Sequence, residues 1–184
     1  MKRFVLAGSA IFISTISIFG QPAVGQTFRI NFNDVDGNAL STADGRITTL
    51  VLSSKANIDK AHVVGERTPD FCLGNPDYRM ITVVSFATKH SRPVRAVLRS
   101  LMRSRIDSEA RQLQMRYEKL KIARNARRDV LAVADFDGEI AQQLGAKSDT
   151  ALFHVFVFGK NGELLKKWSD VPSAEELAAA LKQN

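Results

Sequence analysis

Apolar residues gather in short runs along the chain, and polar or glycine-containing turns separate these runs. The runs at 47–52, 80–86, 130–134 and 152–158 are nearly continuous and rich in β-branched or aromatic residues. Such runs are typical of strands that are buried on both faces of a sheet. Residues 28–32 instead alternate between apolar and polar positions, as a half-buried strand does. We therefore expect a central sheet with an additional strand near the N-terminus.

Helical patterns fill most of the stretches between these runs. The predicted helical segments are residues 55–66, 91–125, 138–144 and the stretch that Ser173 opens. Glu176 follows Ser173 at the spacing of a capping box, which marks a helix N-terminus. A turn at 160–162 leads into a last strand at 163–168. Helices between buried strands predict an α/β fold with a central mixed sheet that is flanked by helices.

The first 25 residues have the layout of a secretory signal peptide. Lys2 and Arg3 form a basic start, and an apolar stretch follows over residues 4–19. Ala23 and Gly25 supply the small residues of a cleavage site, so we expect cleavage after Gly25. This leaves residues 26–184 as a single domain in the periplasm or outside the cell. The alternative is an uncleaved anchor, although a helical span needs about 20 apolar residues.

Several segments, taken in order, point to a known family. They are the turn at 34–37, the buried strand at 47–52, the stretch 135–145 and the hairpin at 155–162. Together they resemble the thioredoxin-like superfamily, and the layout is similar to its exported redoxin or TlpA-like branch. The resemblance implies a thioredoxin-like sheet, here with an N-terminal strand-and-turn extension and a long basic helical segment.

The active site that the resemblance implies is missing. In that family a CxxC motif lies just after the first central strand, at the start of the first helix, where the thiol pKa is lowered. The matching stretch of this chain contains no cysteine, and its polar residues are Ser53, Ser54, Lys55 and Asp59. The family also places a cis-proline before the hairpin strand, where residues 149–152 contain no proline. Dithiol oxidoreductase activity is therefore not expected. Unrelated enzyme chemistry in this cleft is a further alternative, but no base is identifiable there.

Cys72 is the remaining redox candidate. It lies between Phe71 and Leu73, with no histidine nearby in the sequence. A free cysteine in this setting is typically a buried, small apolar residue. The alternatives are a reactive thiol, which needs an electropositive and partly exposed pocket, or a cross-link to another chain.

Other kinds of site have little support. The histidines His62, His90 and His154 are far apart and lack the spacing of metal ligands. No nucleophile elbow, phosphate-binding glycine loop or dinucleotide fingerprint occurs in the chain. We therefore expect neither a metal ion nor a cofactor.

Charge is distributed unevenly along the chain. The 184 residues contain 26 Lys and Arg against 19 Asp and Glu, a formal net charge of +7, and 45% are apolar, which suits one globular domain. Residues 91–128 alone hold 12 basic residues against three acidic ones. Arg92, Arg95, Arg99 and Arg103 recur at helical spacing, on the side of the helix opposite the apolar set 94–101. Together with Arg111 they form the candidate contact surface. A solvated face is the simpler interpretation of these cations.

The apolar positions of this helical segment do not stay on one side. At about 100° per residue, the set 106–120 is rotated by roughly a quarter to a third of a turn from the set 94–101. A straight helix could not bury both sets against one sheet, so we expect a kink or break at 104–108.

These patterns favour an exported, non-catalytic binding or assembly module that uses its basic helical surface. The expected partner is an acidic protein or another anionic component of the cell envelope. Nucleic acid is not the expected partner because aromatic residues are not interleaved with the cations. No transmembrane segment is expected after signal cleavage. The alternative is a single-cysteine redox protein in which peroxide oxidises Cys72 or Cys72 forms mixed disulfides.

Overall fold

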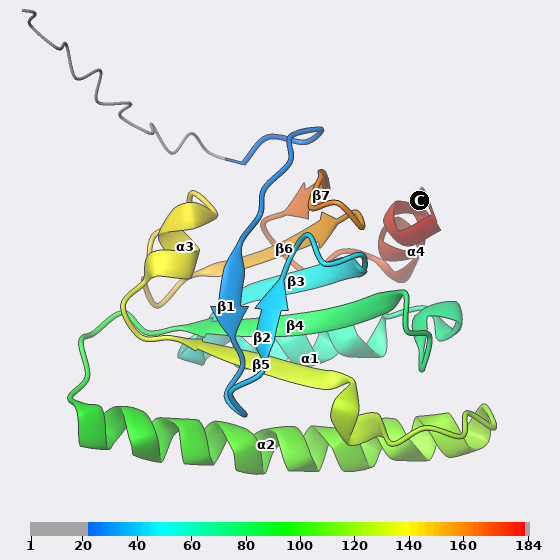
Figure 1. Cartoon of the computed structure of the whole chain (residues 1–184), viewed down its shortest axis with the longest axis horizontal. Helices are drawn as coiled ribbons and strands as arrows, with labels where there is room; N and C mark the ends of the chain where they lie inside the picture. The colour runs from blue at the N-terminus through cyan, green and yellow to red at the C-terminus, as the bar shows by residue number, and fades with distance from the viewer. Residues whose placement is uncertain (1–21, 183–184) are drawn as a thin grey trace, which may run out of the picture.

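A computed structural model describes residues 22–182, so most of the predicted signal peptide lies outside the described residues. The main sheet has five strands: β3 (Ile47–Ser54), β4 (Tyr78–Ser85), β5 (Val130–Asp135), β6 (Phe153–Phe158) and β7 (Leu164–Trp168). Their order across the sheet is β5-β4-β3-β6-β7 (Figure 1). The first three run parallel, whereas β6 and β7 are antiparallel to their neighbours. This mixed sheet confirms the predicted α/β class.

A short hairpin precedes the sheet. It consists of β1 (Asn31–Asn33) and β2 (Ala39–Ser41), which pair in antiparallel fashion. Its turn forms because the Asp34 carboxylate accepts hydrogen bonds from the backbone N–H groups of Asp36 and Asn38, at 2.9 and 2.8 Å. The hairpin is the predicted N-terminal extension, although β1 is shorter than the stretch 28–32 expected from the sequence.

Helices and the hairpin cover the two faces of the sheet. The helices are α1 (Ile58–Glu66), α2 (Arg92–Lys119), α3 (Glu139–Gln143) and α4 (Ala174–Lys182). The hairpin and α3 pack on one face, where Phe32 and Ile140 meet Leu50 and Phe156. On the other face, side chains of α1 and α4 meet those of β3 and β6. All eight residues of β3 are buried, as the continuous apolar run predicted.

Helix α2 lies along the β5 edge of the sheet instead of over its centre (Figure 1). Its buried contact there joins Ile106 to Ala132 of β5 and to Val35 after β1. Of the 28 residues of α2, the buried ones are Ile106, Ala110 and Tyr117. The helix is therefore attached to the domain mainly through its second half.

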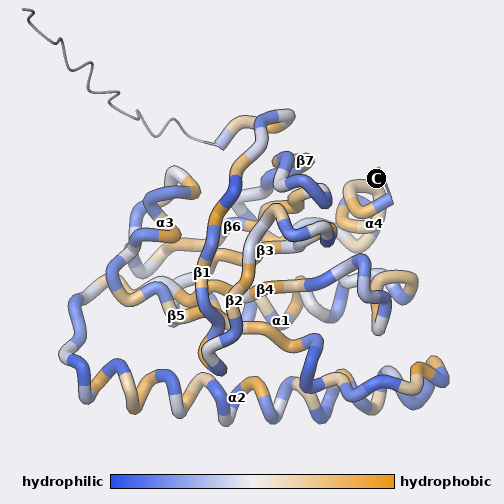
Figure 2. The backbone as a smooth tube through the Cα atoms, in the orientation of Figure 1, coloured by the Kyte–Doolittle hydropathy of each residue, from blue (hydrophilic) through white to orange (hydrophobic). Residues whose placement is uncertain are grey.

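The predicted break at 104–108 is wrong. Helix α2 is continuous from Arg92 to Lys119, and Figure 1 shows no sharp bend in it. The reason is that the helix does not bury both apolar sets. Its first half leaves Val94, Val97 and Leu101 exposed at 43%, 59% and 61%. Figure 2 accordingly shows hydrophilic residues mixed with apolar ones along all of α2. Among the described residues, none of the helices has the length and apolar character needed to cross a membrane.

Candidate functional site

The stretch where thioredoxins carry their cysteines is occupied by two buried serines. Ser53 and Ser54 end β3. The Ser54 hydroxyl donates a hydrogen bond to the carbonyl oxygen of Thr150 at 2.8 Å, and the Ser53 hydroxyl donates to the carbonyl oxygen of Ser54 at 2.9 Å. Neither hydroxyl has a histidine or carboxylate partner within residues 22–182. Neither serine is therefore placed as an activated nucleophile.

The two charged residues predicted at this position lie on the surface. Lys55 begins a 3₁₀ turn (Lys55–Asn57) and makes no ion pair with any residue of the described range 22–182. Asp59, in the first turn of α1, accepts a hydrogen bond from Arg105 of α2 at 2.8 Å. Residues 149–152 contain no cis peptide bond, like the rest of the described chain. These groups do not assemble a general base beside a nucleophile.

Cys72 ends a 3₁₀ turn (Asp70–Cys72) and is buried, with an exposed fraction of 7%. It lies in the cluster that contains Ala61 of α1 and Leu177 of α4. Burial raises the pKa of the Cys72 thiol to about 12, so the thiol is protonated at neutral pH. This environment supports the interpretation of Cys72 as a small apolar residue of the core.

Three of the five predicted contact arginines face the domain. Arg95 forms two hydrogen bonds with the carboxylate of Asp137, at 2.6 and 2.7 Å. Its guanidinium lies 5.2 Å from the centre of the Phe136 ring, and that of Arg99 lies 5.1 Å from the same ring. Arg103 pairs with Asp36 at 3.3 Å. These cations therefore hold the first half of α2 to the domain.

The other two arginines face solvent, and so do Val94 and Val97 of the apolar set. Arg92 and Arg111 are exposed and make no ion pair with any residue from 22 to 182. The sequence predicted that the apolar set 94–101 would face the sheet and the arginine stripe would face solvent. The buried side of α2 is instead set by Ile106, Ala110 and Tyr117, which lie on the same side as the stripe.

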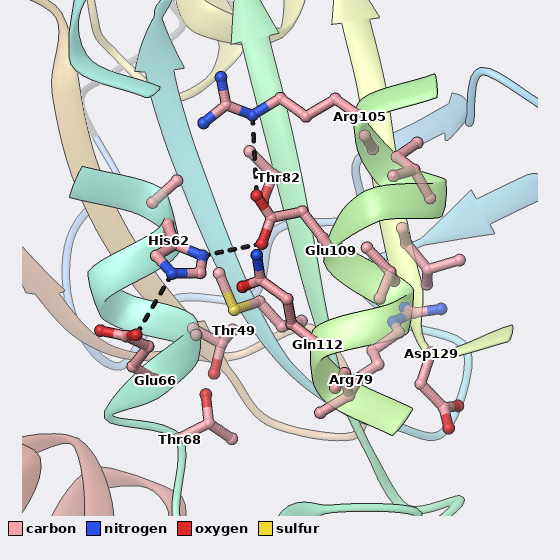
Figure 3. Close-up of a pocket in the computed structure, with 18 of the residues that line it drawn as sticks. Thr49, His62, Glu66, Thr68, Arg79, Thr82, Arg105, Glu109, Gln112 and Asp129 are labelled. Carbon is pink, nitrogen blue, oxygen red and sulfur yellow. Dashed lines mark hydrogen bonds and ion pairs between the residues drawn. The ribbon is translucent and has the colours of Figure 1, made fainter. Parts of the chain in front are cut away.

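A cavity of about 550 Å³ lies between α1 and α2, over the face formed by β3, β4 and β5 (Figure 3). Its floor includes Met80, Thr82 and Val84 of β4 and Ala132 of β5. This site was not predicted from the sequence. Its lining residues come from separate segments, and no local motif marks them. The one available signal was the conflict between the two apolar sets of α2.

Charged side chains cross the mouth of the cavity. The Nδ1 atom of His62 lies 2.8 Å from Oε2 of Glu109, so this contact connects α1 to α2. The Nε2 atom of His62 lies 3.2 Å from Glu66, and Arg105 lies 3.8 Å from Glu109. Figure 3 shows these side chains meeting in front of the strands.

The described part of the chain holds no group of three or more His, Cys, Asp or Glu side chains arranged to bind a metal ion. His90 and His154, the other two histidines, each have a buried Nδ1 atom without a hydrogen-bond partner in residues 22–182. They do not line the cavity.

Comparison with known proteins gives structural relatives only. No family model and no curated protein matches the sequence. The exposed lipoprotein thioredoxin of Streptococcus pneumoniae strain TIGR4 is similar in structure, with a TM-score of 0.53, 16% identity, and coverage of 85% of this chain and 100% of that one. A thioredoxin-like protein from Aeropyrum pernix gives a TM-score of 0.52 at 12% identity, over 85% of this chain and 89% of that one.

A third similar structure is a thiol:disulfide interchange protein DsbE from Chlorobium tepidum, with a TM-score of 0.51 at 12% identity and coverage of 88% and 99%. Identities this low show a shared fold, and they do not transfer a function. The sheet order, the flanking helices and these likenesses agree with the resemblance found in the sequence. This chain therefore has a thioredoxin-like fold with a single cysteine and no CxxC pair.

Proposed function

We propose that this chain is an exported, non-catalytic binding or assembly module with a thioredoxin-like fold. The absence of dithiol chemistry is supported by the serines at the end of β3, whose hydroxyls are bonded to backbone carbonyls. Burial of Cys72 supports the same conclusion, because redox chemistry requires a thiolate. Export is supported by the signal-like pattern of residues 1–25.

The single observation that carries the proposal is the exposed apolar strip on α2. Val94, Val97 and Leu101 follow the spacing by which a helix inserts one face into a groove of a partner. A soluble domain gains nothing in stability from large apolar side chains left in water, so such a strip suits an interface. The exposed cations Arg92 and Arg111 lie on the same helix. The partner that fits is an acidic protein or another anionic envelope component with an apolar groove.

A photo-crosslinking amino acid at position 97 tests this proposal in the producing cells. We expect a discrete adduct from position 97 and none from the matched exposed position Lys166 on β7, at the opposite edge of the sheet. The yield of the adduct from position 97 should fall as the salt concentration is raised from about 0.05 to 0.5 M, because salt screens the attraction between opposite charges. Arg92→Glu with Arg111→Glu should reduce the adduct in the same way.

Equal adducts from positions 97 and 166, or adducts that salt and the arginine changes leave unaffected, would contradict the proposed surface. Export is measured separately, from the mass of the chain recovered from the envelope fraction. A chain that keeps residues 1–25, or that stays in the cytoplasm, would contradict the exported location.

A further inference from the structure

The central strand β4 is incompletely covered. β4 lies between β3 and β5, a place where strands are normally buried on both faces. Its alternate residues Tyr78, Met80 and Thr82 are nevertheless only half-buried. They line the cavity because α1 packs against β3 while α2 stands at the β5 edge. The cavity is thus a gap in the helical layer, built by the same placement of α2 that exposes its apolar strip.

The cavity is a channel that runs along α2. Its lining on α2 extends from Leu98 to Tyr117, which is about 28 Å at 1.5 Å per residue. Its volume of about 550 Å³ is within the range of small-molecule sites. The His62–Glu109 contact crosses the mouth, and both side chains are about one-third exposed there, at 35% and 30%. A helix, at about 10 Å in diameter, could not enter without separating this pair.

Among the lysines and arginines that line the cavity, one has no ion pair within residues 22–182. Each carboxylate that lines it has a close neighbour: Glu66 and Glu109 lie beside His62, Glu109 also lies 3.8 Å from Arg105, and Asp129 pairs with Arg124. The lining arginines are paired as well, Arg79 with Asp44, Arg105 with Asp59 and Arg116 with Asp70. Lys55 alone among these lining cations has no ion pair with the part of the chain that the structure describes.

Lys55 lies at one end of the channel. It follows directly after β3, and Phe86 follows β4, whose Ser85 pairs with Ser54. This is the edge of the sheet at the carboxyl ends of the parallel strands, where α/β folds commonly bind ligands. Apolar side chains then line the channel away from Lys55, among them Met102, Ile106 and Leu113.

We propose that this cavity binds a long-chain carboxylate, with the carboxylate group at Lys55 and the single alkyl chain in the channel between α1 and α2. A flexible alkyl chain fits an elongated, mainly apolar cavity whose mouth the His62–Glu109 contact crosses. A single anionic head group would pair with Lys55, the lining lysine that has no ion pair within residues 22–182. Leu101 borders both this cavity and the outer strip of α2, whereas Val94 and Val97 do not line the cavity, so variants at 97 and at 82 test the two sites independently.

Displacement of a fluorescent long-chain carboxylate, cis-parinarate, from the purified exported protein tests the inference. We expect palmitate to displace the probe, and hexadecyltrimethylammonium, which has the same chain with a cationic head, to displace it at least tenfold less well. Lys55→Met should weaken palmitate binding about fivefold, the effect of losing one partly exposed ion pair. The matched control Lys166→Met, on β7 and outside the cavity, should leave it unchanged.

A second pair of variants locates the alkyl chain. Thr82→Phe fills the channel from the floor and should reduce palmitate affinity at least tenfold. Gly65→Met fills it from α1, where an added Cβ would lie 3.8 Å from the sulfur of Met80, an ordinary contact. Thermal unfolding shows which of the two variants fold. One folded variant is sufficient to test whether the alkyl chain lies in the channel.

Several results would overturn the inference. The first is that palmitate does not displace the probe. The second is that palmitate displaces it from both filled variants and from the unchanged protein equally well. The third is that the cationic amphiphile displaces it as well as palmitate does. In a further outcome, palmitate fails to displace the probe from Val97→Glu and yet displaces it from Thr82→Phe. That result would place the alkyl chain on the exposed strip of α2. Tighter binding of lysophosphatidylglycerol than of palmitate would replace the carboxylate with a phospholipid ligand.

Discussion

The hydroxyl of Tyr117, near the end of α2, donates a hydrogen bond to Oδ2 of Asp129, the residue before β5, at 2.9 Å. The same hydroxyl accepts a hydrogen bond from the backbone N–H of Gly74 at 3.0 Å. Tyr117 is 1% exposed, and burial together with the bond to Asp129 raises its pKa to about 12. Because α2 buries so few residues, this contact fixes where its second half lies, and with it one wall of the cavity.

Removing that hydroxyl should destabilise the domain. Tyr117→Phe leaves the N–H of Gly74 without its acceptor and takes one donor from Asp129, so we expect the free energy of unfolding to fall by about 1–3 kcal/mol. Urea unfolding measures this loss. Tyr78→Phe is the control, since the Tyr78 hydroxyl has no hydrogen bond within residues 22–182. Equal losses for the two variants would show that the network around Tyr117 does not hold α2.

Gly74 also limits what the connection beside Tyr117 can accept. Its φ is +66°, and a Cβ added there would lie 2.5 Å from Cγ2 of Ile122. At Gly37 the φ is +92°, but no atom lies within 4 Å of an added Cβ. Gly37→Ala should therefore cost only the backbone strain, about 1–2 kcal/mol, whereas Gly74→Ala should cost clearly more. Thermal unfolding compares the two. A Gly74→Ala variant as stable as Gly37→Ala would mean that Ile122 moves aside freely.

The strands and the fold could be predicted because the signals that specify them are local. The continuous run at 47–52 became β3, which is buried throughout, and the turn at 34–37 became the N-terminal hairpin. Their order along the chain carried the resemblance to thioredoxins, which the solved structures support. The missing CxxC pair could be read directly from the sequence.

The placement of α2 could not be predicted in the same way. Helical spacing shows which residues share a side, but not which side faces the domain. Here the arginines Arg95 and Arg103 face the domain because Asp137 and Asp36, distant in sequence, lie where their guanidinium groups reach them. Val97 is consequently exposed. The cavity has the same origin, since it exists only in the space that α2 leaves open.

Cys72 should react slowly with alkylating reagents. A thiol pKa of about 12, against 9.0 for a free cysteine, lowers the thiolate fraction at pH 8 about 1,000-fold, and the rate should fall accordingly. Urea should restore the rate of a free thiol. Between pH 9 and 12 the unfolded chain loses this proton before the folded one, so stability should decrease as pH rises through that range. Fast alkylation of the folded protein, with an apparent pKa below 9, would instead support the Cys72 redox alternative.

His154 should make the domain less stable in mild acid. It lies on β6 with a buried Nδ1 atom that has no partner in the described chain. Burial lowers its pKa from the ordinary value of 6.5, and the positive charge of Lys167 lowers it further. As pH falls below about 7, the unfolded chain binds a proton that folded His154 does not yet accept, so the free energy of unfolding decreases.

The slope contributed by one such proton is at most about 1.4 kcal/mol per pH unit. His154→Gln removes the titrating group, so urea unfolding between pH 7 and 5 should show a shallower decline for this variant than for the unchanged protein. An NMR titration of the His154 ring should give a midpoint below that of the urea-unfolded chain. Parallel declines for the two proteins, or coincident midpoints, would mean that the imidazole of His154 reaches solvent and gains its proton in the folded state as readily as in the unfolded chain.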